Sequence, residues 1–344
     1  MTPRKKSALS QFRDPWGLMW RMLRSGDSAA YWALFQQAAG LLLIPLDLLG
    51  VPFDRRLARS ARSADLPLII LIGPPRSGST LVYQVLSRHL DVTYFTNLSA
   101  LFPRSPLLYS YLTAALRWIP KERYRSFYGN TGGLSAPSDG FHIWNRWLGT
   151  NRYEVPNGIS VAESNEMQEY LSAWALHAGK PLLNKNNRNS ACVPLLSSGL
   201  TNSYFVEVSR DPLYVAQSLL IARKVVQGSE ETGWGLSSQN VSDGASREAV
   251  VDEVCNQVQR ILEVLKTARD SIPEDRILRV SYEDLCARPS DVVRQVSQAI
   301  PGVAVRSESR LDDLEPMRVS NRRRVSRREF EQIRRRLGRG DQAP

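Results

Sequence analysis

The stretch that decides the fold runs from Leu68 to Thr80 and reads Leu-Ile-Ile-Leu-Ile-Gly-Pro-Pro-Arg-Ser-Gly-Ser-Thr. Its first five residues are a continuous apolar run, long enough to form a strand that is buried on both faces. A turn bounded by glycines follows, and apolar residues then recur with helical spacing in the segment 81–86. The sequence therefore predicts a buried strand, a glycine-rich turn and a helix.

Such a turn points free backbone N–H groups and the positive end of a helix dipole toward an anion. It has the length of a P-loop: Gly73, four residues, Gly78 and then two hydroxyl residues. In nucleotide-hydrolysing P-loops a lysine follows the second glycine, but here Ser79 stands there, and Arg76 is the cation of the loop. The loop therefore suits a 5′-phosphate better than a magnesium-bound triphosphate. The alternative is an ordinary corner shaped by prolines and glycines.

The residues from Gly73 to Leu81 resemble the 5′-phosphosulfate loop of sulfotransferases that use 3′-phosphoadenosine 5′-phosphosulfate (PAPS). The Arg-Ser-Gly form is similar to that of bacterial and tyrosylprotein members. The resemblance implies a P-loop-like sulfotransferase fold, PAPS as the co-substrate and no metal. It also implies that the donor is held by the loop residues Arg76, Ser77, Gly78, Ser79 and Thr80.

Length and composition predict an ordinary globular protein. A chain of 344 residues with 42% hydrophobic residues can form one large α/β domain or two small ones. Its three cysteines, Cys192, Cys255 and Cys286, are widely spaced and odd in number. This pattern favours reduced thiols in a cytoplasmic protein over a disulfide framework or a zinc site.

The positive charge is concentrated near the C-terminus. The whole chain carries a net charge of +11, and the segment 318–339 holds ten Arg against two Glu, giving 10 − 2 = +8. The remainder is then near +3, so we expect no nucleic-acid partner. We divide the chain into a basic N-terminal segment with an apolar helix (1–66), a catalytic domain (67–317) and an Arg-rich C-terminal tail (318–344).

The N-terminal segment contains nineteen uncharged residues, 28–46, after a basic flank. We favour a helix packed on the catalytic domain. A helix lying on an anionic membrane surface through residues 1–50 is an alternative, and a membrane span is a third. No cleavage site makes a secretory signal convincing, so we expect a cytoplasmic protein that is either free or membrane-associated.

Further strands are predicted at 181–185, 204–209 and 276–281, and helices at 161–178, 212–226, 245–269 and after residue 290. The spacing of Ser160 and Glu163 is that of a capping box, and Gly179 ends that helix. Alternating strands and helices predict a single α/β domain with a mostly parallel central sheet, flanked by helices and binding ligands at the carboxyl ends of its strands. The loop 129–158 is either an acceptor-binding lid or a surface loop anchored by tryptophans.

Three further segments match the sulfotransferase pattern. Arg210-Asp-Pro with Ser218 is similar to the family's 3′-phosphate motif, and Arg suits a phosphate because its planar fork donates two bonds. Tyr282 resembles the family's tyrosine near the adenine. Lys185 stands near the position of the lysine that neutralises the leaving phosphate oxygen.

The sequence departs from the family pattern at the residue that would accept the proton. Cytosolic members carry a catalytic His two residues after the Lys, and here that residue is Asn187, which cannot take a proton. We propose His142 together with Asp139 in the same loop as candidates for proton transfer. A single His among aromatic residues also fits a structural role.

The sequence thus predicts a PAPS-dependent sulfotransferase acting on a hydroxyl or amine without a metal. Two alternatives are a P-loop kinase-like phosphotransferase and a non-catalytic, nucleotide-sensing peripheral membrane protein. The sequence does not identify the acceptor, and a glycan, a lipid, a peptide and a small metabolite are all compatible with it.

Overall fold

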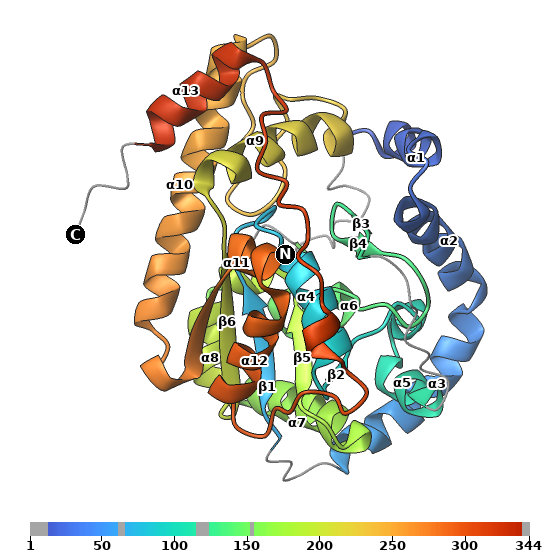
Figure 1. Ribbon diagram of the computed structural model, residues 1–344. Coiled ribbons are helices and arrows are strands. Elements are labelled where there is room, and N and C mark those ends of the chain that lie inside the picture. Colours follow the sequence, from blue (N-terminus) through green and yellow to red (C-terminus); the bar gives the residue numbers. More distant parts are fainter. Residues whose placement is uncertain (1–12, 61–65, 115–123, 152–154, 339–344) are drawn as a thin grey trace.

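The computed structural model describes residues 13–60, 66–114, 124–151 and 155–338 (Figure 1). Its centre is a five-stranded parallel sheet in the order β2-β5-β1-β6-β7. The strands are β1 (Leu68–Ile72), β2 (Thr93–Tyr94), β5 (Leu182–Lys185), β6 (Ser203–Ser209) and β7 (Ile277–Ser281), and a separate hairpin is formed by β3 (Ser126–Phe127) and β4 (Asn130–Thr131). The predicted α/β fold with a parallel central sheet is confirmed.

The central position of β1 follows from its composition. All five of its residues are buried, because helices cover both faces of the sheet. Side chains alternate along a strand, so Ile69 and Leu71 pack on one face of the sheet while Leu68, Ile70 and Ile72 pack on the other. The register pairs Leu71 with Lys185 of β5 and Ile72 with Glu207 of β6.

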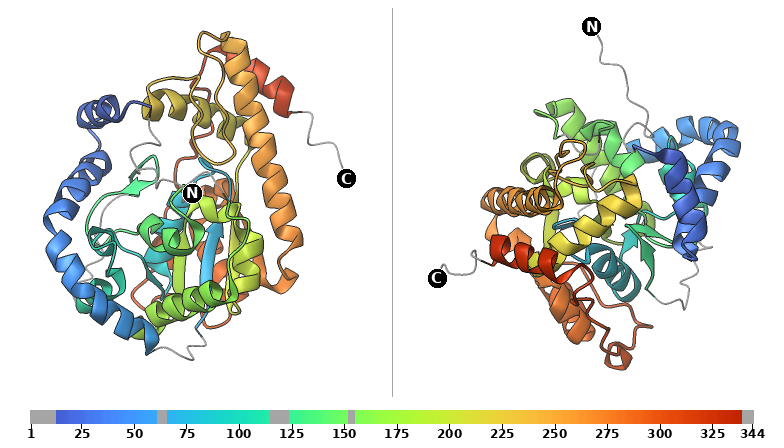
Figure 2. Two further views of the ribbon diagram at one scale, coloured as in Figure 1. Left: turned by 180° about the vertical axis from the view of Figure 1, so that it is seen from behind. Right: turned by 90° about the horizontal axis from the view of Figure 1, so that it is seen from above.

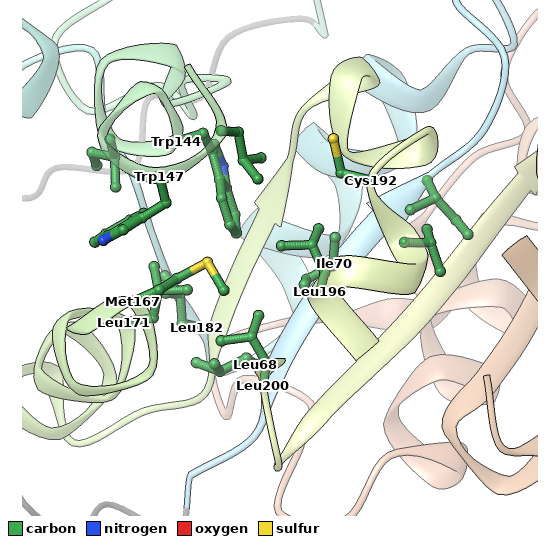
Figure 3. Packing of buried hydrophobic residues seen from close by; sticks show 14 of the residues in the cluster. Leu68, Ile70, Trp144, Trp147, Met167, Leu171, Leu182, Cys192, Leu196 and Leu200 are labelled. Carbon is green, nitrogen blue, oxygen red and sulfur yellow. The ribbon is translucent and has the colours of Figure 1, made fainter. Parts of the chain in front are cut away.

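Helices cover the two faces in separate groups. On the Ile69 face lie α4 (Ser79–His89), α11 (Tyr282–Ala287) and α12 (Pro289–Ala299). On the Leu68 face lie α6 (Phe141–Leu148), α7 (Val161–Ala178), α8 (Val193–Gly199) and part of α10 (Arg247–Asp270). Figure 3 shows the second packing layer, in which Trp144 and Trp147 of α6 lie against residues of α7 and the sheet.

Both tryptophans of the predicted 129–158 loop are therefore core residues. Trp144 also donates from Nε1 to Oδ1 of Asn184, 2.7 Å away. Helix α7 has the predicted bounds, with the Ser160–Glu163 capping box and Gly179 at its end. Nε2 of His177 in its last turn lies 3.1 Å from the backbone oxygen of Leu57.

The C-terminal segment packs on the main domain. After Leu311 the chain returns across the carboxyl ends of the strands and forms α13 (Arg327–Leu337), which lies beside α10 and α9 (Pro212–Ala222). A third apolar cluster joins these three helices and buries Ile333. A π-helical segment, 223–227, extends α9 to about the residue predicted.

The N-terminal segment forms α1 (Pro15–Arg24), α2 (Ser28–Leu42) and α3 (Ile44–Arg59). The predicted helix 28–46 is thus two helices that meet at Leu43. The three helices follow one edge of the molecule as an arc (Figures 1 and 2), and α3 packs against α5 (Pro106–Leu112) and α7. The first twelve residues, with the basic cluster Arg4 to Lys6, and the stretch 115–123 lie outside the described residues.

Two glycines shape the turn after β1. Gly73 has φ +148° and Gly78 has φ +87°, both in the region that disfavours a side chain. A Cβ on Gly78 would overlap the ring of Tyr282. The turn therefore needs glycine at position 78 for its backbone and for the tyrosine that covers it.

We expect Gly78→Ala to lower the free energy of unfolding by more than Gly133→Ala does. Gly133 has φ +93° but open space around its Cβ position, so it carries only the backbone cost of about 1–2 kcal/mol. Gly78→Ala adds the overlap with Tyr282, typically about 1–3 kcal/mol. Urea unfolding of both variants measures the difference, and equal losses would contradict the close contact.

Candidate active site

A polar cavity of about 210 Å³ lies at the carboxyl ends of β1, β5, β6 and β7. Parallel strands end on the same edge of a sheet, so the residues that follow them meet there. Most of the site residues predicted from the sequence line this cavity: Arg76, Gly78, Ser79, Thr80, Lys185, Arg210 and Tyr282. Asn187 also lines it.

The turn after β1 presents unused hydrogen-bond donors. Within the described chain, the backbone N–H groups of Gly78, Ser79 and Thr80 donate to no acceptor, as is usual at a helix start. Ser77 is fully buried, and its Oγ has no hydrogen-bond partner among the described residues. These donors converge where α4 begins, an arrangement suited to an anion.

Arg76 has φ +72°, a conformation that costs energy for a residue with a side chain. Its Nε donates to Oγ of Ser218, 3.0 Å away, and its guanidinium lies 4.7 Å from the ring centre of Tyr128. Burial lowers the pKa of Arg76, and the positive charges of Arg210 and Arg324 lower it further. Ser218 thus accepts a hydrogen bond from Arg76 of the loop, and its predicted role beside Arg210 at a 3′-phosphate stays a prediction.

Arg210 links three segments of the chain. It follows β6 and donates from Nη1 to the backbone oxygen of Arg76, 2.9 Å away. Its other nitrogens donate to Oδ1 of Asn321, at 3.0 and 2.8 Å, and to Oγ of Ser320. The guanidinium also lies 4.6 Å from the ring centre of Tyr282. The C-terminal segment therefore reaches the site and meets the phosphate loop there.

Arg76, Arg210 and Arg324 form a cluster of like charges. Holding three guanidinium groups close together is unfavourable unless an anion compensates them. Two of them face the cavity together with the unused backbone donors of the turn. The arrangement is that of an anion site.

Lys185 ends β5 and is 1% exposed. Its Nζ donates to the two carboxylate oxygens of Asp139, at 3.0 and 3.2 Å. A buried ammonium needs such a partner because its desolvation is otherwise costly. The structure therefore brings together two residues that the sequence proposed for different roles, 46 positions apart.

A second cavity of about 430 Å³ adjoins the first. It shares Tyr128, Gly129 and Trp234 with the donor cavity, and Asp139 and His142 line it. Its outer wall includes Leu18 and Met22 of α1 and Gln36 of α2. The candidate proton acceptors therefore face a space that opens beside the anion site, bounded by the N-terminal helices.

His142 is neutral near pH 7. Burial and the charge of Arg146 lower the pKa of His142 from 6.5 to about 3, and its Nε2 is buried without a hydrogen-bond partner among the described residues. A ring with so low a pKa is a weak proton acceptor. The pairing of His142 with Asp139 stays a prediction, with Asp139 the member that contacts Lys185.

Several site residues were not identified from the sequence, among them Tyr128, Trp234, Ser320, Asn321 and Arg324. Ser320 and Asn321 lie within the arginine-rich segment 318–339 that the charge count singled out, but nothing local to that segment predicts its return to the strand ends. Within the described ranges, no three His, Cys, Asp or Glu side chains form a metal-binding group.

The fold and the cavity define an α/β protein of the P-loop-like class, with a basic anion site at the end of the central strand. The chain belongs to the sulfotransferase family, whose model matches residues 67–302. Sulfotransferase STF1 from Mycobacterium tuberculosis is similar in structure, with a TM-score of 0.52 over 96% of this chain and 93% of that one, at 14% identity. Sulfotransferase STF9 from Mycobacterium avium has a TM-score of 0.49, covering 84% and 72%, at 16% identity. No curated protein matches the sequence.

The low pKa of His142 makes stability depend on pH. In the unfolded chain this histidine takes up a proton near pH 6.5, whereas in the folded chain it does so only near pH 3. Stability is therefore fully present above pH 6.5 and falls as the pH drops toward 3, by up to about 1.4 kcal/mol per unit. The free energy of unfolding, measured with urea between pH 5 and 7, should change less with pH for His142→Gln than for the wild type. An identical pH dependence of the two proteins would argue against a buried neutral ring.

Proposed function

We propose that the protein transfers a sulfuryl group from PAPS to a hydroxyl or amine acceptor without a metal. The observation that carries the proposal is the cavity at the strand ends, which combines the turn 73–80 with Arg76, Arg210 and Lys185. Membership of the sulfotransferase family supports the reaction class.

The turn after β1 suits the 5′-phosphosulfate. The free N–H groups of Gly78, Ser79 and Thr80 and the buried Ser77 hydroxyl offer neutral donors to its oxygens. Ser79 occupies the position where a nucleotide-hydrolysing P-loop has a lysine. The loop therefore favours a phosphate with few charges, which agrees with PAPS better than with a triphosphate.

Arg210 suits the 3′-phosphate. Its guanidinium now donates to the neutral oxygens of Asn321 and Ser320. A phosphate dianion is a stronger acceptor than an amide or a hydroxyl, so it would compete well for these donors. Tyr282, with its ring against Arg210 and over Gly78, offers an aromatic surface next to that site for the adenine.

The chemistry requires charge stabilisation around the transferred group. The acceptor oxygen or nitrogen forms a bond to sulfur, the bond from sulfur to the bridging phosphate oxygen breaks, and the acceptor loses one proton. The products are a sulfate ester or sulfamate, the 3′,5′-bisphosphate and that proton. Lys185 and Arg76 line the cavity as cations that would stabilise the negative charge that develops.

Asp139 is the better candidate to receive the proton. Its carboxylate contacts Lys185 on the donor side and lines the second cavity, where an acceptor would enter. His142 lines the same cavity but is a weak base because of its low pKa. Proton transfer to a positioned carboxylate typically contributes about 10²–10⁴-fold to a rate.

We expect the protein to bind 3′-phosphoadenosine 5′-phosphate far more tightly than AMP. The missing 3′-phosphate leaves Arg210 without a charged partner, and a bond to a charged group contributes about 1.5–3 kcal/mol. Calorimetry with both nucleotides measures this preference.

The preference should largely vanish in Arg210→Gln and persist in Arg279→Gln, a control that removes an exposed arginine of β7. Equal affinity of the wild type for the two nucleotides would overturn the assignment of Arg210. Comparing both nucleotides on the same variant separates loss of the 3′-phosphate site from a general effect on the loop.

Lys185→Gln should reduce sulfate transfer by roughly a hundredfold or more, with a much smaller loss of nucleotide affinity, because the lysine meets charge that develops during transfer. The assay follows labelled sulfate from PAPS into an extract of the native cell, with excess EDTA present. Lys180→Gln, which removes a surface ion pair with Asp91, is the control and should leave the rate unchanged. No sulfate transfer by the wild type, or phosphoryl transfer from labelled ATP instead, would contradict the proposed function.

A further inference from the structure

Over its first three turns helix α3 buries its acidic residues and exposes large apolar ones, the reverse of an ordinary surface helix. Its exposed arginines follow near its C-terminal end. Its two acidic residues, Asp47 and Asp54, are each only 1% exposed. Leu46, Leu49 and Phe53 point outward and are 49%, 69% and 59% exposed. A helix on a water-soluble surface normally places its charges outward and its apolar side chains inward.

The two buried aspartates attach α3 to the domain. Asp47 accepts bonds from the backbone N–H groups of Arg104 and Ser105, just before α5. Asp54 accepts from the backbone N–H of Leu108 and from the hydroxyl of Tyr170 in α7. The inner face of α3 therefore packs on the domain, and only its outer face is exposed.

The exposed apolar surface continues along α2 and α1. Between Ser28 and Phe53 no charged side chain is exposed, and α1 adds a row with helical spacing. We call this set the apolar arc; its large exposed members are Trp16, Met19, Trp20, Leu23, Tyr31, Phe35, Leu41, Leu42, Leu46, Leu48, Leu49 and Phe53. Contiguous surfaces of this kind on a monomer mark interaction sites.

The exposed charges of the first three helices are mostly positive. Five arginines of the segment 13–60 are exposed: Arg13, Arg24, Arg55, Arg56 and Arg59. The four aspartates of the segment are engaged within the protein. Asp14 and Asp27 cap α1 and α2, and Asp47 and Asp54 are buried.

We propose that the apolar arc binds the surface of an anionic lipid bilayer. Its leucines and phenylalanines enter the boundary between headgroups and acyl chains, the tryptophans and Tyr31 lie at the interface, and the arginines contact lipid phosphates. None of the described helices alone is long and apolar enough to cross a membrane. Helices α2 and α3 meet that test only as a pair, and they are bent by 77°.

The charge pattern favours lipid over a second copy of the chain. In a two-fold symmetric dimer the same surface meets itself, so each charged group needs its partner on that surface. The apolar arc is bordered by exposed arginines, whereas the carboxylates of the segment 13–60 are buried or already engaged as helix caps. An anionic membrane supplies the missing negative charges, whereas a copy of this surface does not.

Flotation of the full chain with vesicles tests the proposal without any assay of activity. The protein should float with phosphatidylcholine vesicles that contain 30% phosphatidylglycerol, and much less with phosphatidylcholine alone or at high salt. Leu49→Gln/Phe53→Gln should weaken binding by at least about tenfold. The matched control is Val161→Gln/Leu262→Gln, which removes two exposed apolar side chains from α7 and α10 and should bind as the wild type does.

Failure of the wild type to float with anionic vesicles would overturn the proposal. Unchanged binding of Leu49→Gln/Phe53→Gln, with a native circular dichroism spectrum, would do the same. A wild-type dimer in sedimentation that this variant converts to monomer, with no vesicle binding, would assign the arc to self-association instead. If that variant fails to fold, Arg55→Gln/Arg56→Gln tests the same surface through its charges and should weaken binding to the anionic vesicles.

Discussion

The parallel pairing of β1 with β5 and β6 fixes the position of the charged groups in the site. Its register sets Leu71 beside Lys185 and Ile72 beside Glu207, and Arg210 directly follows the end of β6. The glycine turn begins at the same edge of the sheet, so the turn that suits an anion lies beside the cationic Lys185 and Arg210 there. Tyr282, after β7, completes the edge. Displacing β1 would therefore separate the whole set at once.

The parts predicted from the sequence are those with a local signature. The apolar run 68–72, the capping box of α7 and the Arg210-Asp-Pro segment each contain their own structural information within a few residues. The ion pair of Lys185 with Asp139 has no such signature, because it joins residues 46 positions apart. The same holds for Asn321, which reaches Arg210 from 111 positions away.

The basic C-terminal segment illustrates the limit of counting charges. Its excess of arginine predicted a tail, yet two of those arginines pair with acidic residues of α10. Arg328 lies 2.5 Å from Glu248, and Arg336 lies 3.0 Å from Asp252. Surface pairs of this kind contribute little individually, so the buried Ile333 and Phe330 hold the helix. Sequence composition gave the amount of charge, whereas packing decided where it is neutralised.

The walls of the two cavities come from different parts of the chain. The first cavity is built mainly from the region matched by the family, 67–302, whereas Leu18, Met22 and Gln36 of the second cavity precede it. Changes in the first two helices can thus reshape the second cavity without disturbing the turn after β1. Under the proposed assignment of the second cavity to the acceptor, the molecule is modular: exchanging a peripheral segment would change the acceptor while the reaction stays the same.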